Sequence, residues 1–161
     1  MLKQLIAELE KGIDPDRAQR TEHYFGIMPG GYGEGDILLG ISSPYVRNVA
    51  RQFRKLPLKE TAELLRSPVH EFRFCALAIL ALQYPKQPEA CIKIYLDNID
   101  YVNNWDLVDC FAAHLLGRWC LENHDEAVLK ELNTHDNLWH RRLSVVSYMA
   151  FYRKGILGDG L

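Results

Sequence analysis

The sequence predicts an all-α protein built as a helical-repeat solenoid, an α-α superhelix of about nine helices. Apolar residues follow helical spacing through nearly the whole chain, whereas the alternation typical of strands is almost absent. Residues that start helices recur ahead of these apolar runs. In addition, segments led by an aromatic residue return after 33 and 34 residues. A period in this range is typical of repeats in which each helical hairpin packs on the next.

Length and composition are those of one domain, which we expect to span residues 1–161. The hydrophobic fraction of 48% is enough for a core, and the charged fraction of 25% is ordinary. The net charge of −2 argues against a protein that simply coats nucleic acid. It leaves room for a local basic face, because cations cluster at Arg47, Arg51, Arg54 and Lys55.

The first third of the chain predicts two helices and a loop. Residues 1–11 are amphipathic, and Asp14 followed by Pro15 starts a helix that we expect to run to about Phe25. Residues 26–36 form a glycine-rich loop, since residues 26–35 hold five glycines and a proline. A phosphate cradle is the alternative, but no GK[ST] and no preceding strand accompany the glycines, which favours a flexible connector.

The remaining helices follow one another through short loops. The start signals and apolar spacing predict helices over about 43–53, 58–65, 67–84, 88–96, 103–121, 125–132 and 136–154. The four cysteines form no CxxC and lie among apolar helical residues, so we expect buried free thiols. The histidines show no metal-ligand spacing, so no metal or other cofactor is expected. Without a signal peptide or a long apolar run, the chain is expected to be cytoplasmic, with no membrane partner.

The repeat register brings particular side chains together. Phe72, Trp105 and Trp139 each stand near the start of a helix, 33 and 34 residues apart. Equivalent positions of successive repeats line one concave surface. We therefore expect three pairs to lie side by side on it: Phe72 with Arg73, Trp105 with Asp109, and Trp139 with Arg142.

Asp109 is the main candidate for a functional residue. Aspartate is unfavourable inside an apolar helix, and a carboxylate facing a core must be paired or hydrogen-bonded. Trp105 precedes it by four residues, so the indole and the carboxylate share one helical face. The alternative is a structural arrangement, in which Trp105 packs in the core and Asp109 forms an ion pair with an arginine of the next repeat.

Two arginines follow Trp139, and they diverge by about 100° around the helix. At most one of Arg141 and Arg142 can therefore face the groove, where a guanidinium suits phosphate. The other is then a solvated surface cation. Tyr24, at the end of the second expected helix, is by itself an aromatic at a helix end.

An ordered set of segments resembles the DNA alkylation repair enzymes of the AlkD-like family, HEAT-like helical-repeat DNA glycosylases. The resemblance runs from about Pro15 to Lys154. It rests on Tyr24, on Gly33-Glu34-Gly35-Asp36, on Leu39-Gly40-Ile41-Ser42-Ser43-Pro44, on Glu71-Phe72-Arg73, on Trp105-Asp106-Leu107-Val108-Asp109 and on Leu138-Trp139-His140-Arg141-Arg142.

The resemblance implies hydrolysis of the N-glycosidic bond of cationic N3- and N7-alkylated purines in duplex DNA, without a metal. Asp109 then matches the catalytic aspartate, and Trp105 the tryptophan against the damaged nucleotide. Arg142 matches the arginine near the DNA backbone, and Tyr24 an aromatic at the edge of the cleft. We assign Trp139 and Arg141 to the same DNA-binding surface. A non-catalytic module that binds DNA or a protein on its concave face is the alternative function.

The resemblance also implies helices beyond those of this chain. An array without its capping repeat exposes an apolar face. We therefore expect either a shortened form or a homodimer through the last helix, with the apolar residues Leu143, Val146, Tyr148, Met149 and Phe151 in the contact.

Overall fold

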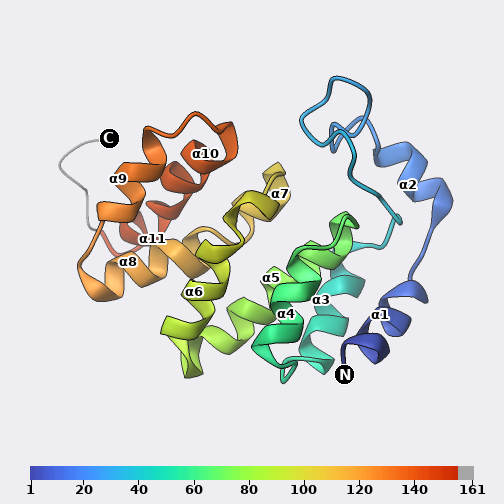
Figure 1. Ribbon diagram of the computed structural model, residues 1–161, viewed down its shortest axis with the longest axis horizontal. Coiled ribbons are helices and arrows are strands. Elements are labelled where there is room, and N and C mark those ends of the chain that lie inside the picture. Colours follow the sequence, from blue (N-terminus) through green and yellow to red (C-terminus); the bar gives the residue numbers. More distant parts are fainter. Residues whose placement is uncertain (156–161) are drawn as a thin grey trace. The chain divides into compact units, whose positions relative to one another are not determined.

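The computed structural model describes residues 1–155 and confirms the all-α, helical-repeat fold class (Figure 1). Within these residues there is no strand, and the one β pairing is an isolated parallel bridge between Ile37 and Val69. The chain divides into two compact units: an N-terminal unit, residues 1–104, and a C-terminal unit that begins at Trp105. A single domain over residues 1–161 stays a prediction.

The N-terminal unit is organised around one buried helix, α5 (His70–Gln83). Helices α3 (Ser43–Gln52), α4 (Leu58–Leu65) and α6 (Pro88–Asp97) pack on it, so every residue from His70 to Leu80 is buried. Helices α1 (Leu2–Glu10) and α2 (Pro15–Thr21) precede this group, and short 3₁₀ turns follow α5 at Tyr84–Lys86 and α6 at Ile99–Tyr101.

The predicted start of α2 is confirmed, but its predicted end is wrong. The Asp14 carboxylate accepts a hydrogen bond from the Arg17 N–H at 2.9 Å, and Pro15 occupies the first helical position. The helix stops at Thr21, and a series of turns leads to Gly26, whose φ of 63° is accessible mainly to glycine.

Hydrogen bonds close the glycine-rich loop on itself, whereas its expected flexibility stays a prediction. The Gly33 N–H donates to the Gly26 carbonyl at 2.9 Å, and the Gly31 N–H donates to the Met28 carbonyl at 2.8 Å. A Cβ on Gly31 would lie 2.0 Å from the Gly26 carbonyl oxygen. Glycine is therefore required where the loop crosses itself.

The C-terminal unit contains α7 (Trp105–Asp109), α8 (Arg118–Asn123), α9 (Ala127–Asn133), α10 (Leu138–Ser147) and α11 (Met149–Tyr152) (Figure 1). The sequence predicts one helix from residue 103 to about 121. A π-helical segment, Ala113–Gly117, interrupts it, with the Gly117 N–H donating to the Ala112 carbonyl at 2.9 Å. The predicted last helix is likewise divided, at Tyr148, into α10 and α11.

Two of the five apolar residues predicted for self-association belong to the core of the C-terminal unit, whereas Val146 and Tyr148 are half-buried. Leu143 and Phe151 are buried, and the Tyr148 hydroxyl donates to the Glu126 carboxylate at 2.9 Å. Met149 is the exposed member of the predicted set. The prediction is therefore wrong for Leu143 and Phe151, because α10 packs on α9 and α11 packs on the π-helical segment, whereas dimerisation itself stays a prediction.

The cysteines behave as core residues in the described part of the chain. All four are free, and Cys75, Cys91 and Cys120 are buried, while Cys110 is half-buried. Burial raises the pKa of the Cys75 and Cys120 thiols to about 12, so both stay protonated at neutral pH. Among residues 1–155, no helix has the length and apolar character needed to cross a membrane.

Candidate active site

The candidate site centres on a two-point ion pair between Asp109, the last residue of α7, and Arg142 in α10. The Arg142 Nε donates to one carboxylate oxygen at 2.8 Å, and its Nη2 donates to the other at 2.7 Å. Thirty-three residues separate the partners, so their expected neighbourhood across one repeat is confirmed, and the ion pair itself is the one that the structural alternative for Asp109 describes. The planar fork of arginine fits both carboxylate oxygens at once, which fixes the direction of each side chain.

This pair lies at the surface and not in the core. The side chain of Asp109 is 36% exposed and that of Arg142 is 45% exposed. The exposure of Asp109 agrees with the expected place of this residue on a surface of the repeats, and it excludes the arrangement in which the carboxylate is buried in the core. An exposed ion pair contributes at most about 1 kcal/mol to stability. Stabilisation of the fold by itself is thus a weak explanation for this ion pair.

The backbone that carries the pair is held by close contact between α10 and the π-helical segment. A Cβ on Gly117 would lie 2.1 Å from the Ser147 carbonyl oxygen and 3.0 Å from its Cα. The Ser147 hydroxyl also donates to the Ala112 carbonyl at 3.4 Å. One turn earlier, the Ser144 hydroxyl donates to the Leu129 carbonyl at 2.7 Å, which ties α10 to the first turn of α9. These contacts fix the position of α10, which carries Arg142, relative to the segment that follows Asp109.

Both tryptophans lie in the first turn of their helices, as the repeat register predicts. Trp105 is the first residue of α7, and Trp139 is the second residue of α10. Both are partly exposed, so neither is a fully buried core residue. The Asn137 side chain accepts a hydrogen bond from the Trp139 N–H at 2.8 Å and thereby fixes the start of α10.

Arg141 turns away from the ion pair. Its Nη1 donates to the His135 carbonyl at 2.7 Å and to the Asp136 carbonyl at 2.9 Å, so the guanidinium closes the turn that precedes α10. The expectation that at most one of the two arginines faces the site agrees with this geometry. Arg141 is nevertheless exposed, and its assignment to DNA stays a prediction.

Tyr24 belongs to the N-terminal unit, apart from the unit that holds the ion pair. Its ring is 63% exposed and stands edge-on to Phe25, with the ring centroids 5.7 Å apart. Its carbonyl accepts a hydrogen bond from the Tyr32 hydroxyl at 3.0 Å. The glycine-rich loop therefore holds the backbone at Tyr24 while the ring faces solvent.

The expected surface pair Phe72 and Arg73 is buried in the N-terminal unit, which corrects that part of the repeat prediction. Arg73 is 2% exposed and forms an ion pair with Asp36. Its guanidinium also donates to the Ser67 carbonyl at 2.9 Å and to the Asn103 side chain at 3.1 Å. The loop before α3 covers this face of α5, which is why the surface position of later repeats is an interior position here.

The environment of Asp36 favours its charged form. Burial raises the pKa of this carboxyl group, but the nearby His70 ring, with its Nδ1 3.9 Å from the carboxylate, and the charge of Arg73 outweigh burial and lower it. Asp36 is therefore ionised at neutral pH and holds the end of the glycine-rich loop onto α5.

A second carboxylate, whose role does not follow from the sequence, anchors the chain just after this loop. Glu71 accepts hydrogen bonds from the backbone N–H groups of residues 39–41, at distances between 2.7 and 3.2 Å. Gly40 is necessary there, because a Cβ would lie 2.0 Å from the Asp14 carbonyl oxygen. The available sequence signal was an acid at the start of an apolar helix. Helical periodicity relates only residues of one helix, so it does not predict a contact with a loop thirty residues earlier.

Comparison with known proteins identifies one family. A family model described as DNA alkylation repair enzyme matches residues 5–160. A search of the curated proteins found no significant match, and neither did a search of the solved structures. Among residues 1–155, no group of three or more His, Cys, Asp or Glu side chains is placed to hold a metal ion.

Proposed function

The chain belongs to the DNA alkylation repair enzyme family, and on that premise we propose that it hydrolyses the N-glycosidic bond of cationic N3- or N7-alkylated purines in duplex DNA. The observation that carries the proposal is the exposed, two-point pairing of Asp109 with Arg142. It offers a carboxylate of fixed direction beside a cation suited to phosphate.

The proposed chemistry needs little from the protein beyond electrostatics. An alkylated purine already carries a positive charge, so it leaves with the electron pair of the C1′–N bond and becomes neutral. The sugar is left as an oxocarbenium-like cation. The Asp109 carboxylate stabilises this charge, orients a water toward C1′ and accepts the proton that the water releases.

Arg142 has two roles in this proposal. In the free protein it fixes the Asp109 carboxylate, although each oxygen keeps a second lone pair for another partner. With DNA bound, its guanidinium contacts a backbone phosphate, which positions the duplex without reading its sequence. The partly exposed rings of Trp105 and Trp139 supply aromatic surface for the cationic base, worth about 0.5–2 kcal/mol.

The test is release of N7-methylguanine from a methylated duplex by the wild-type protein and by Asp109→Asn. Asparagine keeps the shape and removes the charge, so we expect base release to fall by about 10²–10³-fold. Asp97→Asn is the matched control, because Asp97 is also an exposed acid in an ion pair, with Lys93 at 2.9 Å. Equal release by wild type and Asp109→Asn would disprove the catalytic role of this residue.

A non-catalytic module is the second candidate, and one observation favours it. Both oxygens of Asp109 already accept hydrogen bonds from Arg142, as a purely structural pair would require. Such a module would bind the duplex with an affinity that falls with salt and weakens on Arg142→Ala, but the wild type would release no base. Affinity that is independent of salt would indicate a protein partner.

A further inference from the structure

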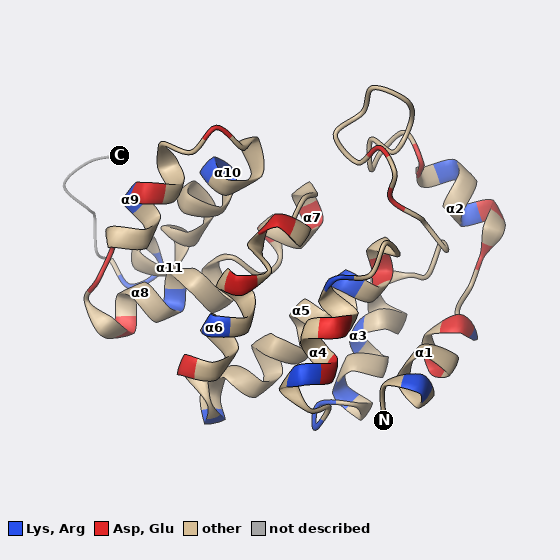
Figure 2. Ribbon diagram, in the orientation of Figure 1, with Lys and Arg blue, Asp and Glu red and all other residues tan. Residues whose placement is uncertain are grey.

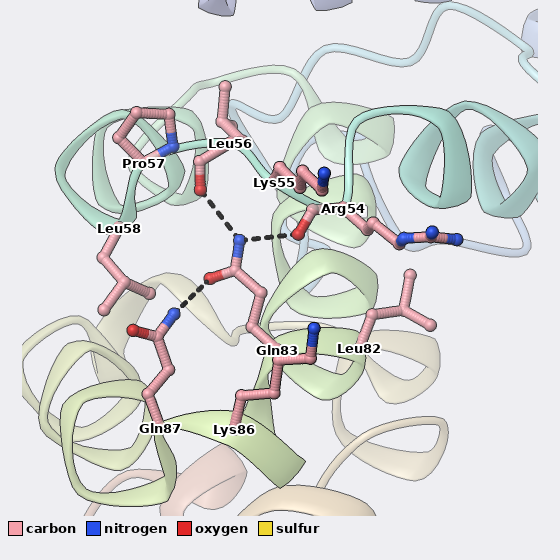
Figure 3. A pocket seen from close by; sticks show the side chains of 9 residues that line it. All are labelled: Arg54, Lys55, Leu56, Pro57, Leu58, Leu82, Gln83, Lys86 and Gln87. Carbon is pink, nitrogen blue, oxygen red and sulfur yellow. Dashed lines mark hydrogen bonds between the residues drawn. The ribbon is translucent and has the colours of Figure 1, made fainter.

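The N-terminal unit contains a basic hollow that has no role in the proposed chemistry. It has a volume of about 620 Å³ and lies between the turn joining α3 to α4 and the end of α5 (Figure 3). Its lining includes three cationic and no acidic side chains (Figure 3). Figure 2 marks the lysine and arginine positions along the ribbon in blue. The cations are Arg54, Lys55 and Lys86.

The backbone beneath two of these cations is fixed by one buried glutamine. The Gln83 side-chain NH₂ group donates to the Arg54 carbonyl at 2.9 Å and to the Leu56 carbonyl at 2.8 Å (Figure 3). Gln87 in turn donates to the Gln83 side-chain oxygen at 3.1 Å. Gln83 therefore holds the turn in place and occupies two carbonyl oxygens that would otherwise contribute partial negative charge to the hollow.

The charge of the hollow differs from that of the whole chain. The net charge of the protein is −2, whereas three positive side chains of the hollow have no acid among the lining residues. Cations are favoured at the C-terminal ends of helices, which accounts for single residues after α3 and α5. This preference does not account for three cations around one hollow. Like charges repel each other there, and a bound anion would neutralise them.

We propose that this hollow binds phosphate groups. Arg54 offers a planar fork for two phosphate oxygens, while Lys55 and Lys86 act as mobile point charges. The volume falls within the range of about 300–1,000 Å³ usual for ligand sites, so there is room for more than one phosphate. The phosphates belong either to a DNA backbone or to a free polyphosphate chain, and the two sources share this chemistry.

The test compares two variants that each remove three positive charges. The hollow variant changes its three cations to glutamine, and the control variant does the same to exposed cations elsewhere in the N-terminal unit. All six side chains are exposed, so both variants keep the fold. The hollow variant carries Arg54→Gln, Lys55→Gln and Lys86→Gln, and the control variant carries Lys3→Gln, Arg20→Gln and Lys93→Gln.

Two probes distinguish the sources: an undamaged 20-base-pair duplex at several salt concentrations, and sodium triphosphate followed by calorimetry. For a DNA backbone, the hollow variant binds the duplex at least about tenfold more weakly at low salt. Its slope of log affinity against log salt falls by about 2–3, near 0.9 for each lost phosphate contact. For a free polyphosphate, wild type and control bind triphosphate, the hollow variant does not, and affinity for the duplex is unchanged.

The inference is overturned if the hollow variant binds both probes as wild type does, if the control variant loses as much, or if wild type binds neither probe. No arm measures base release, so this result is independent of the role proposed for Asp109. If the protein binds duplex through the hollow but releases no base, the glycosylase proposal is refuted and the phosphate-binding proposal is not.

Discussion

Gly117→Ala tests whether the contact between α10 and the π-helical segment positions the candidate site. Gly117 is a glycine inside a helical stretch, where alanine is ordinarily more stable by about 1 kcal/mol. Here a Cβ would lie 2.1 Å from the Ser147 carbonyl oxygen and 2.9 Å from its carbonyl carbon. The substituted side chain therefore collides with backbone, which cannot rotate away as a side chain could.

The structure sets the size of the effect. An ordinary carbon–oxygen contact is more than 1 Å longer than the distance available, so α10 or the π-helical segment must move by about 1 Å. Overpacking of this kind costs typically 1–3 kcal/mol, and this case belongs at the upper end because only backbone can move. After the gain in helix propensity is subtracted, we expect a net loss of about 2 kcal/mol in the free energy of unfolding.

Urea denaturation and thermal unfolding measure this loss directly. For a chain of this length, 2 kcal/mol corresponds to a fall in Tm of about 4–8 °C. Movement of α10 also displaces Arg142 from Asp109, and an error of about 1 Å can cost about 100-fold in rate. Base release from a methylated duplex should therefore fall more than the loss of stability alone explains, at a temperature where the variant is still folded.

Ser147→Ala is the matched control, because it alters the other side of the contact without adding an atom to Gly117. It removes only a long hydrogen bond of 3.4 Å to the Ala112 carbonyl, so we expect a loss below about 1 kcal/mol. If Gly117→Ala were as stable as wild type or more stable, the close approach of α10 would carry no constraint and the reasoning would fail.

The other predictions concern the acids that anchor the glycine-rich loop. Asp36→Asn leaves Arg73 buried without its counter-charge and should cost about 3 kcal/mol in urea denaturation at pH 7. The pKa of Asp36 is lowered in the folded protein, so its stabilisation is present above the ordinary value near 3.8 and is lost as the pH falls through the folded pKa. The gap between wild type and Asp36→Asn should thus narrow below pH 4, and a gap independent of pH would contradict this. Glu71→Gln weakens the charge-assisted bonds to residues 39–41 and should cost about 1.5–3 kcal/mol, with faster amide exchange there. Unchanged exchange, or an equal effect of the exposed control Glu89→Gln, would refute the anchoring role.

Most of the helices could be predicted because their signals are local. Asp14 with Pro15 and Asn137 ahead of Trp139 form caps with their own neighbours, so the sequence suffices to place these starts. The interruption at Ala113–Gly117 was not predictable in the same way. Apolar spacing continues smoothly through it, and the close contact of this segment is with the backbone of Ser147, thirty residues later.

The candidate site could likewise be predicted only in part. The repeat register placed Arg142 beside Asp109, because a constant period brings equivalent positions of successive hairpins together. The same register failed for Arg73, which is buried because the loop of residues 26–41 packs over it. Periodicity describes the repeats and carries no information about a loop that covers one of them.

The sequence by itself determined the helical class, the period of the repeats and the partnership of Asp109 with Arg142, since all three depend on local propensity and constant spacing. The tertiary structure alone decided that this pair is exposed, that Arg141 closes a turn, and that three cations meet around Gln83. The physical reason is that exposure and charge clustering depend on which segments pack together, and these contacts join residues too distant for any periodic pattern to connect.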